Sequence, residues 1–361
     1  MNSTISRLLL LVAGLIFALS ITEGALKWLG VGDYDVGEMG PGLLEYDQRL
    51  GWKLVPGVEV GHRHQDFDVT YRTDTWGLRR DGFDGKPGAA STWILGDSFT
   101  FGIGVEDDET FVARLNAVTG GDTGSFVNFG QIGYATDQSV LLLEKMVEWH
   151  GTPDEVLLVV YVGNDLVDNL HAVPTQAPRP KPFFEIESGE LSLRGVPVPR
   201  SPGRSPSFSE EILGRVYHPG AIERTLSSTK IGTMLWSAKN RVLGQPQLAW
   251  SGAFDDQLEL FRLLIDRVSQ STTKLSLVLL GGKAVVESPD SFSGQYQNYL
   301  RSEIMGMRFP DNVAVHDMIT PLQDAFRQER LVLYHPNEGH LSRLGHDYIA
   351  KNWPIQANRG N

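Results

Sequence analysis

The sequence contains no cysteine, which excludes disulfide bonds, thiolate nucleophiles and cysteine-ligated zinc. Positive charge is also scarce, because 32 lysine and arginine residues face 44 aspartate and glutamate residues, for a net charge of −12. Binding a phosphate backbone needs a basic surface, so nucleic acid is excluded as a partner. Apolar residues, in contrast, make up 41% of the 361 residues, which is ample for the core of a large globular domain with additions.

The amino terminus has the pattern of a targeting segment. The run Leu8–Ile21 carries no charge until Glu23, and an arginine precedes it. We predict an uncleaved signal anchor within residues 1–30, which places the body outside the cytoplasmic membrane: a single pass in a bacterial inner membrane with the body in the periplasm. The run is shorter than the ~20 residues of a comfortable transmembrane helix. Two alternatives remain: a signal peptide cleaved near Ala18-Leu19-Ser20, which would release the body by secretion, and a buried amino-terminal helix.

The spacing of apolar residues divides the rest of the chain into segments. Residues 31–90 alternate in short polar and apolar steps, which predicts a small β-rich leader. From residue 91 to 353, apolar runs of strand length alternate with helical stretches at 136–150, 254–270 and 291–305. Residues 171–252 interrupt this alternation with proline-rich sequence and are interpreted as an insertion, and residues 354–361 as a tail.

Five apolar runs between residues 91 and 353 read as strands that are buried on both faces. They are STWILG, SFVNFG, EVLLVVYV, KLSLVLL and NVAVHD. Uninterrupted apolar strands that alternate with helices predict an α/β fold in which a parallel five-stranded sheet is sandwiched by helices.

Polar and glycine residues follow several of these strands directly. Ligands bind at the carboxyl ends of strands in an open parallel sheet, so these residues are candidates for one site. A final helix beginning near Ser342 would follow one of them, and Thr136 or Asp137 would cap the helix at 136–150. The groups at the strand ends are Gly96-Asp97-Ser98, Gly130 with Gly133, Gly163-Asn164-Asp165 and His340.

These motifs resemble the four blocks of the SGNH/GDSL hydrolase superfamily. Ser98 stands in GDSF, Gly133 in NFGQIGYAT, Asn164 in VGND and His340 in NEGHLSRLGH, so the resemblance covers about residues 90–353. Some bacterial members of this superfamily begin with a membrane anchor and a segment that contains Gly-Trp, and they are related to polysaccharide O-acetylation proteins. The leader segment YDQRLGWKLVPG resembles theirs. The resemblance implies a three-layer α/β/α, flavodoxin-like fold and esterase or acyl-transfer chemistry.

The residues themselves suggest how the chemistry would run. His340 would take the proton of Ser98 as the hydroxyl attacks an ester carbonyl, and would return it to the departing alcohol. The backbone amides of Ser98 and Gly133 and the side-chain amide of Asn164 would stabilise the oxyanion. Glu338 would orient His340, with Asn337 as the alternative third member and a serine–histidine dyad as a further one. No metal or other cofactor is needed.

Other polar features are assigned structural roles. His62 and His64 share one face of a strand, and solvated side chains are favoured over a metal site. The acidic run Glu106–Glu109 is interpreted as a solvated loop. The basic residues of the insertion are also interpreted as solvated rather than as a site for anionic glycan or lipid; they are Arg179, Lys181, Arg194, Arg200, Arg204 and Arg215.

The combined prediction is an exported serine esterase or deacylase. Its substrates would be acyl esters, acetyl esters above all, with esterified carbohydrate as a candidate class, and its amino-terminal helix would hold it at the membrane. Two alternatives stay open: an O-acyltransferase that modifies extracellular polysaccharide, and a non-catalytic assembly or binding factor for such a polysaccharide.

Overall fold

The computed structural model describes residues 3–28, 37–83, 87–88, 91–119, 126–217, 229–232, 234–235, 238 and 248–353. The chain forms two compact units, Met1–Asp35 with Glu211–Ala253 and Val36–Glu210 with Phe254–Asn361. The predicted insertion 171–252 therefore divides between the two units, whereas the described leader lies in the second. The predicted tail 354–361 falls outside the described residues.

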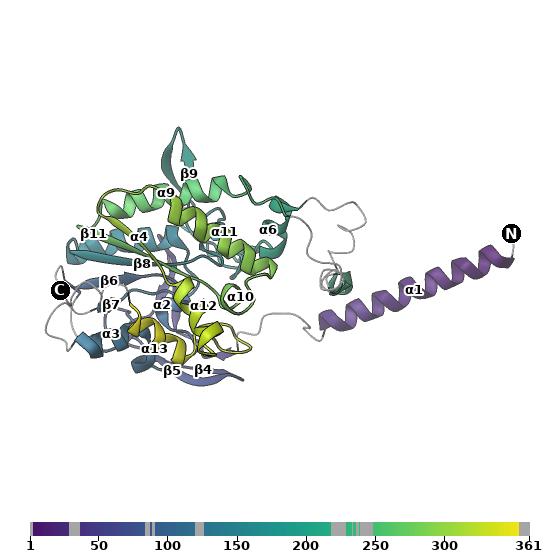
Figure 1. Cartoon of the computed structure of the whole chain (residues 1–361), viewed down its shortest axis with the longest axis horizontal. Coiled ribbons are helices and arrows are strands. Elements are labelled where there is room, and N and C mark those ends of the chain that lie inside the picture. Colours follow the sequence, from purple (N-terminus) through teal and green to yellow (C-terminus); the bar gives the residue numbers. More distant parts are fainter. Residues whose placement is uncertain are drawn as a thin grey trace. The chain divides into compact units, whose positions relative to one another are not determined.

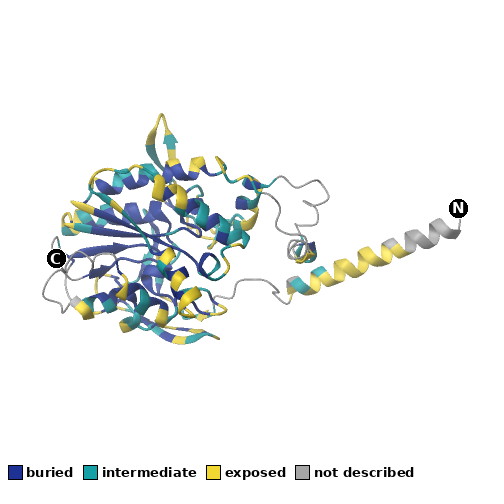
Figure 2. Cartoon of the chain, viewed as in Figure 1, coloured by how far each residue is buried: buried dark blue, intermediate teal, exposed yellow. Residues whose placement is uncertain are grey.

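A parallel five-stranded sheet forms the centre of the second unit. Its strands are β6 (Thr92–Leu95), β7 (Phe126–Asn128), β8 (Glu155–Tyr161), β11 (Lys274–Leu280) and β12 (Val313–Asp317). They lie in the order β12-β11-β8-β6-β7, and all the pairs are parallel. Each strand coincides with one predicted apolar run, and β6, β7 and nearly all of β8 and β11 are buried (Figure 2).

Helices flank the sheet, which confirms the predicted three-layer α/β/α class. Figure 1 shows α9 and α11 on one side of the strands and α3 and α13 on the other. The three stretches predicted as long helices form α4 (Thr136–His150), α9 (Asp255–Ser269) and α11 (Phe292–Gly306). The other helices of this unit are α2 (Ser98–Phe101), η1 (Asp107–Glu109), α3 (Phe111–Thr119), α5 (Asp165–Asp168), α10 (Lys283–Glu287), α12 (Ile319–Gln328) and α13 (Arg343–Lys351).

The two predictions about where helices begin had different outcomes. The final helix, predicted to begin near Ser342, is α13, and Ser342 caps it by accepting a hydrogen bond from Gly345 N. The prediction for α4 was wrong, because the cap position is Ala135 and both Thr136 and Asp137 lie inside the helix. The Asp137 carboxylate instead forms a buried ion pair with Lys181.

The leader is β-rich and packs against the sheet domain. Its strands are β1 (Glu38–Met39), β2 (Leu44–Asp47), β3 (Gly51–Leu54), β4 (Glu59–His64) and β5 (Phe67–Arg72). Strands β1, β4 and β5 form one antiparallel sheet, and β2 and β3 form a hairpin. Apolar side chains of these strands share a core cluster with Phe101 and Ile103, the residues that follow Ser98 in the chain.

Two predictions of solvated side chains in this region were wrong. His62 and His64 face inward, because alternate positions of β4 are buried. His62 Nδ1 and the Tyr71 hydroxyl form a hydrogen bond of 2.7 Å, and the same hydroxyl accepts from Gly104 N, so His62 Nδ1 has a buried partner in place of the predicted solvent. Among the described residues, no cluster of His, Asp and Glu could hold a metal ion.

The acidic run Glu106–Glu109 is likewise part of the structure. Asp107 accepts a 2.8 Å hydrogen bond from the buried guanidinium of Arg79, which comes from the end of the leader. Burial lowers the pKa of Arg79, and the charge of Asp107 acts against that shift. The run therefore supplies the counterion of a buried arginine rather than a solvated loop.

The first part of the insertion forms an antiparallel hairpin, β9 (Phe183–Glu187) and β10 (Glu190–Arg194), and α6 (Phe208–Val216) follows. The prediction that its basic residues are solvated was wrong for Lys181, which is 1% exposed and bound to Asp137. Arg194 pairs with Glu185 and Glu187 on the exposed hairpin, and the Arg200 guanidinium lies over the Tyr46 ring.

In the first unit, helix α1 (Ser3–Trp28) contains the predicted run Leu8–Ile21, part of which lies outside the residues whose side chains are described. Many of its described apolar side chains are exposed. Within the described part of the chain, no helix meets the length and hydropathy needed to cross a bilayer.

Candidate active site

Ser98 lies where β6 ends and α2 begins. The preceding Asp97 caps α2 by accepting a hydrogen bond from Phe99 N at 2.9 Å. Burial raises the pKa of Asp97 to about 6, although the neighbouring His340 acts in the opposite direction. Only 5% of Ser98 is exposed, and its Oγ lies 2.7 Å from Nε2 of His340. A strand end and a short helix thus present the hydroxyl to an imidazole 242 residues away in sequence.

Glu338 holds the other side of the His340 ring. Its Oε1 lies 2.6 Å from Nδ1, and its Oε2 accepts a 2.9 Å hydrogen bond from the His340 backbone N. A carboxylate can only accept, so Nδ1 carries the proton and the Nε2 lone pair faces the Ser98 hydroxyl. The ring also contacts Phe99, with 4.5 Å between the centroids. The structure therefore brings Ser98, His340 and Glu338 together in the order that proton transfer requires.

Asn337, the alternative third member, has a different partner. Its backbone N and its Nδ2 donate to the carboxylate of Asp66 at 2.8 and 2.7 Å, and Glu338 N donates to the same carboxylate at 2.9 Å. Burial alone would raise the pKa of Asp66, but these hydrogen bonds lower it. Asn337 thus serves the contact between the β4–β5 turn and the loop that carries Glu338.

Two residues missed in the sequence analysis position this loop. Asp66 occupies the tip of the leader hairpin, as described above. His335 donates from Nε2 to Gly104 O at 3.1 Å, and so joins the histidine loop to the segment after Ser98. Burial lowers the pKa of His335. No local signal marks either residue, because each acts through a contact more than 200 residues away.

The three predicted oxyanion donors follow neighbouring strands. Ser98 follows β6, Gly133 follows β7 and Asn164 follows β8, and these strands are adjacent and parallel. Gly133 has φ +76°, a conformation that favours glycine. One N–H of the Asn164 amide donates to Asp168 at 2.7 Å, which fixes the side chain and leaves its second N–H for an oxyanion. That these groups form the oxyanion hole stays a prediction.

Neighbouring elements hold these donors in place. Trp52 of β3 donates from Nε1 to Ile132 O at 2.8 Å, next to Gly133. A side chain at Gly130 would collide with the backbone of Thr100 and Phe101, so strand β7 and helix α2 can approach closely only with glycine there. Asp165 accepts from Tyr161 N at 3.0 Å; burial, together with the negative charge of Asp97, raises its pKa. Asp165 thus supports the turn that carries Gly163 and Asn164.

The site occupies one edge of a parallel sheet with strand order β12-β11-β8-β6-β7, and the serine, glycine, asparagine and histidine blocks follow one another in sequence around it. This arrangement agrees with the resemblance of the sequence motifs to those of SGNH hydrolases. Each motif has a fixed place in the fold. Ser98 follows β6, the loop with Gly133 follows β7, Asn164 follows β8, and His340 precedes α13.

Comparisons with known proteins find matches only among solved structures. No protein-family model matches the chain, and no curated protein is similar in sequence. A lipolytic protein of the G-D-S-L family from Veillonella parvula DSM 2008 is 12% identical, with 75% of this chain and 99% of that chain covered and a TM-score of 0.42. An acetylxylan esterase from Geobacillus stearothermophilus is 14% identical, with 75% of this chain and 96% of that chain covered and a TM-score of 0.35. At these identities and TM-scores the matches assign neither a family nor an activity to this chain, and the proposal below rests on the geometry around Ser98.

Proposed function

We propose that this protein is an exported serine esterase that hydrolyses short acyl esters through an acyl-enzyme on Ser98. The observation that carries the proposal is the continuous hydrogen-bonded series Ser98 Oγ, His340 and Glu338, with separations of 2.7 and 2.6 Å. A serine hydroxyl is a weak nucleophile by itself and needs such a base.

The geometry supports a two-step acyl transfer. His340 Nε2 takes the Ser98 proton as Oγ bonds to the ester carbonyl carbon, and Glu338 stabilises the resulting imidazolium. The carbonyl oxygen becomes negative and would accept from the Ser98 and Gly133 amides and from Asn164. Collapse breaks the bond to the alcohol, which receives the proton from His340. Water then attacks the acyl-enzyme by the same steps, releases the acid and restores Ser98.

The burial of the site favours a small acyl group. Ser98 and Asn164 are 5% and 6% exposed, and Phe99 stacks between His340 and Tyr161 with centroid distances of 4.5 and 4.4 Å. A site this buried suits a small group better than a long chain, and an acetyl group adds only two carbons. We therefore favour acetyl esters, and the family resemblance suggests esterified carbohydrate as the source.

We also propose that the body acts outside the cytoplasmic membrane. The apolar Leu8–Ile21 run behind a single arginine supports export of the residues that follow it. Externally added protease should digest the protein only after the outer barrier of a two-membrane bacterium has been opened. Recovery of the body in the cytoplasmic fraction would contradict this part of the proposal.

The test of the chemistry uses p-nitrophenyl acetate and a fluorophosphonate probe on the full chain. The probe should label Ser98, and Ser98→Ala should abolish both labelling and turnover. Labelling that survives this substitution would show another nucleophile and overturn the proposal. Parallel reactions with an oligosaccharide acceptor, analysed by mass spectrometry, separate hydrolysis from acyl transfer, since only transfer yields acylated sugar. Absence of both turnover and labelling would point to a non-catalytic factor.

A further inference from the structure

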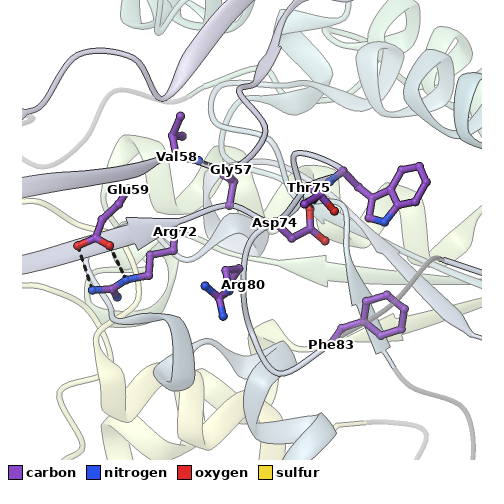
Figure 3. A pocket seen from close by; sticks show the side chains of 10 residues that line it. Gly57, Val58, Glu59, Arg72, Asp74, Thr75, Arg80 and Phe83 are labelled. Carbon is purple, nitrogen blue, oxygen red and sulfur yellow. Dashed lines mark hydrogen bonds and ion pairs between the residues drawn. The ribbon is translucent and has the colours of Figure 1, made fainter.

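We propose that the leader contains a separate binding site for a neutral oligosaccharide. A hollow of about 600 Å³ lies at one end of β4 and β5 (Figure 3), and none of its lining residues belongs to the site around Ser98. The lining comes from the segment before β4 and from the chain that leaves β5. The lining residues are Gly57, Val58, Glu59, Arg72, Thr73, Asp74, Thr75, Trp76, Arg80 and Phe83.

The wall of the hollow is a rigid turn. Asp74 Oδ1 accepts hydrogen bonds from Trp76 N and Leu78 N at 2.8 and 2.9 Å. The Asp74 carbonyl accepts from Gly57 N, and its amide donates to Leu78 O. Thr73 Oγ1 is buried and donates to Val55 O. A turn fixed by so many bonds loses little conformational entropy when a ligand binds.

Aromatic side chains supply the apolar part. Trp76 is 46% exposed, and Phe83, which also lines the hollow, is half-buried. The Trp76 ring touches the His150 ring edge-on, with 5.2 Å between the centroids. Exposed, firmly held tryptophan offers a flat surface to the C–H face of a pyranose ring.

The charged side chains divide into one fixed pair and one open donor. Glu59 holds Arg72 through both carboxylate oxygens, and Asp107 holds it from another side. Arg80, in contrast, makes no hydrogen bond or ion pair through its guanidinium with the residues that the structure describes, and in Figure 3 it points into the space between Arg72 and Phe83. Its N–H groups are therefore available to a ligand.

Charge balance identifies the class of ligand. Glu59 and Arg72 neutralise each other, and the Asp74 carboxylate offsets the positive charge of Arg80, so the hollow offers no net attraction to an anion. It does offer donors on Arg80, an acceptor on Asp74, the Thr75 hydroxyl and an aromatic face. Adjacent hydroxyls of a neutral sugar match this set, because each can donate to a carboxylate and accept from a guanidinium. The inference deepens the proposed function, since this site would retain a polysaccharide whose esters Ser98 cleaves.

Calorimetric titration of the full chain carrying Ser98→Ala tests the site without interference from hydrolysis. The ligands are xylohexaose, mannohexaose and cellohexaose, with hexagalacturonate as the charged arm. We expect at least one neutral hexasaccharide to bind, with affinity changing by less than roughly twofold between about 50 and about 500 mM NaCl. Trp76→Ala should weaken binding by about tenfold. Arg80→Met, at an exposed position, should weaken it by roughly threefold or more.

Trp149→Ala is the matched control, because Trp149 is 56% exposed and lies outside the hollow. It should leave the affinity unchanged. Failure of every neutral hexasaccharide to bind, or binding that Trp76→Ala and Arg80→Met leave intact, would overturn the proposal. Salt-sensitive binding of hexagalacturonate alone would also overturn it and show an anion site. Esterase activity is measured separately on the protein with Ser98 intact, so either proposal can fail while the other stands.

Discussion

Replacement of Glu338 by glutamine tests the third member of the catalytic series with little change of shape. In the native protein both carboxylate oxygens act as acceptors, one for His340 Nδ1 at 2.6 Å and one for the His340 backbone N at 2.9 Å. Glutamine keeps one acceptor and turns the other into a donor. It also removes the negative charge that stabilises imidazolium.

The size of the effect follows from the tautomer that glutamine selects. If its oxygen accepts from the His340 backbone N, its amide donates to Nδ1 and places the imidazole proton on Nε2, where it cannot accept from Ser98. If its oxygen faces Nδ1 instead, the amide N–H of the glutamine side chain points at the backbone N–H of His340, and two donors face each other without an acceptor. Either outcome costs transition-state stabilisation, and the equivalent change in a serine protease lowers kcat about 10⁴-fold. We expect a loss of about 10³-fold or more, which corresponds to about 4 kcal/mol, with little change in KM.

Steady-state kinetics on p-nitrophenyl acetate measure this loss, with thermal unfolding as a check that the variant is folded. Asn337→Ala is the companion variant, because Asn337 binds Asp66 and makes no hydrogen bond to His340. It should lower kcat by less than about tenfold. A folded Glu338→Gln enzyme with nearly native kcat would refute the triad and leave Ser98 and His340 as a dyad.

Three further predictions concern two contacts of the leader and one buried histidine of the sheet domain. Asp66→Ala, which removes three hydrogen bonds to the loop of the candidate base, should lower kcat by about tenfold, whereas Asp68→Ala, on the exposed side of the same hairpin, should not change it. Asp107→Asn leaves the buried charge of Arg79 without its counterion and should reduce the free energy of unfolding by about 3 kcal/mol in urea denaturation; an unchanged midpoint would contradict the buried pair. Burial lowers the pKa of His346 from 6.5 to about 3, so the native protein should lose stability, relative to His346→Gln, as the pH falls from about 6.5 towards 3; parallel pH profiles of unfolding for the two proteins would rule this out.

The sequence alone determined the sheet and the order of the site residues. Strand-length apolar runs and helical periodicity are local properties, so each run became a strand and each long periodic stretch a helix within about one residue of its predicted bounds. Glu338 and His340 lie two residues apart, so their pairing follows from one turn. Ser98 lies at the carboxyl end of β6, where ligands bind in a parallel sheet, whereas Glu338 and His340 reach it from the loop between α12 and α13 rather than from a strand end.

Tertiary structure alone decided what the leader does. The alternation of β4 placed His62 and His64 on one face, but only packing against Tyr71 and Phe67 shows that this face is buried. The link from Asp66 to Glu338 spans 272 residues, and no local pattern encodes a contact at that distance. The ion pair of Lys181 with Asp137 also depends on the fold. A lysine in a proline-rich segment is predicted to be solvated, and only the structure shows its carboxylate partner. Periodicity reveals which side chains share a face, whereas the partner that each face meets is a property of the folded chain as a whole.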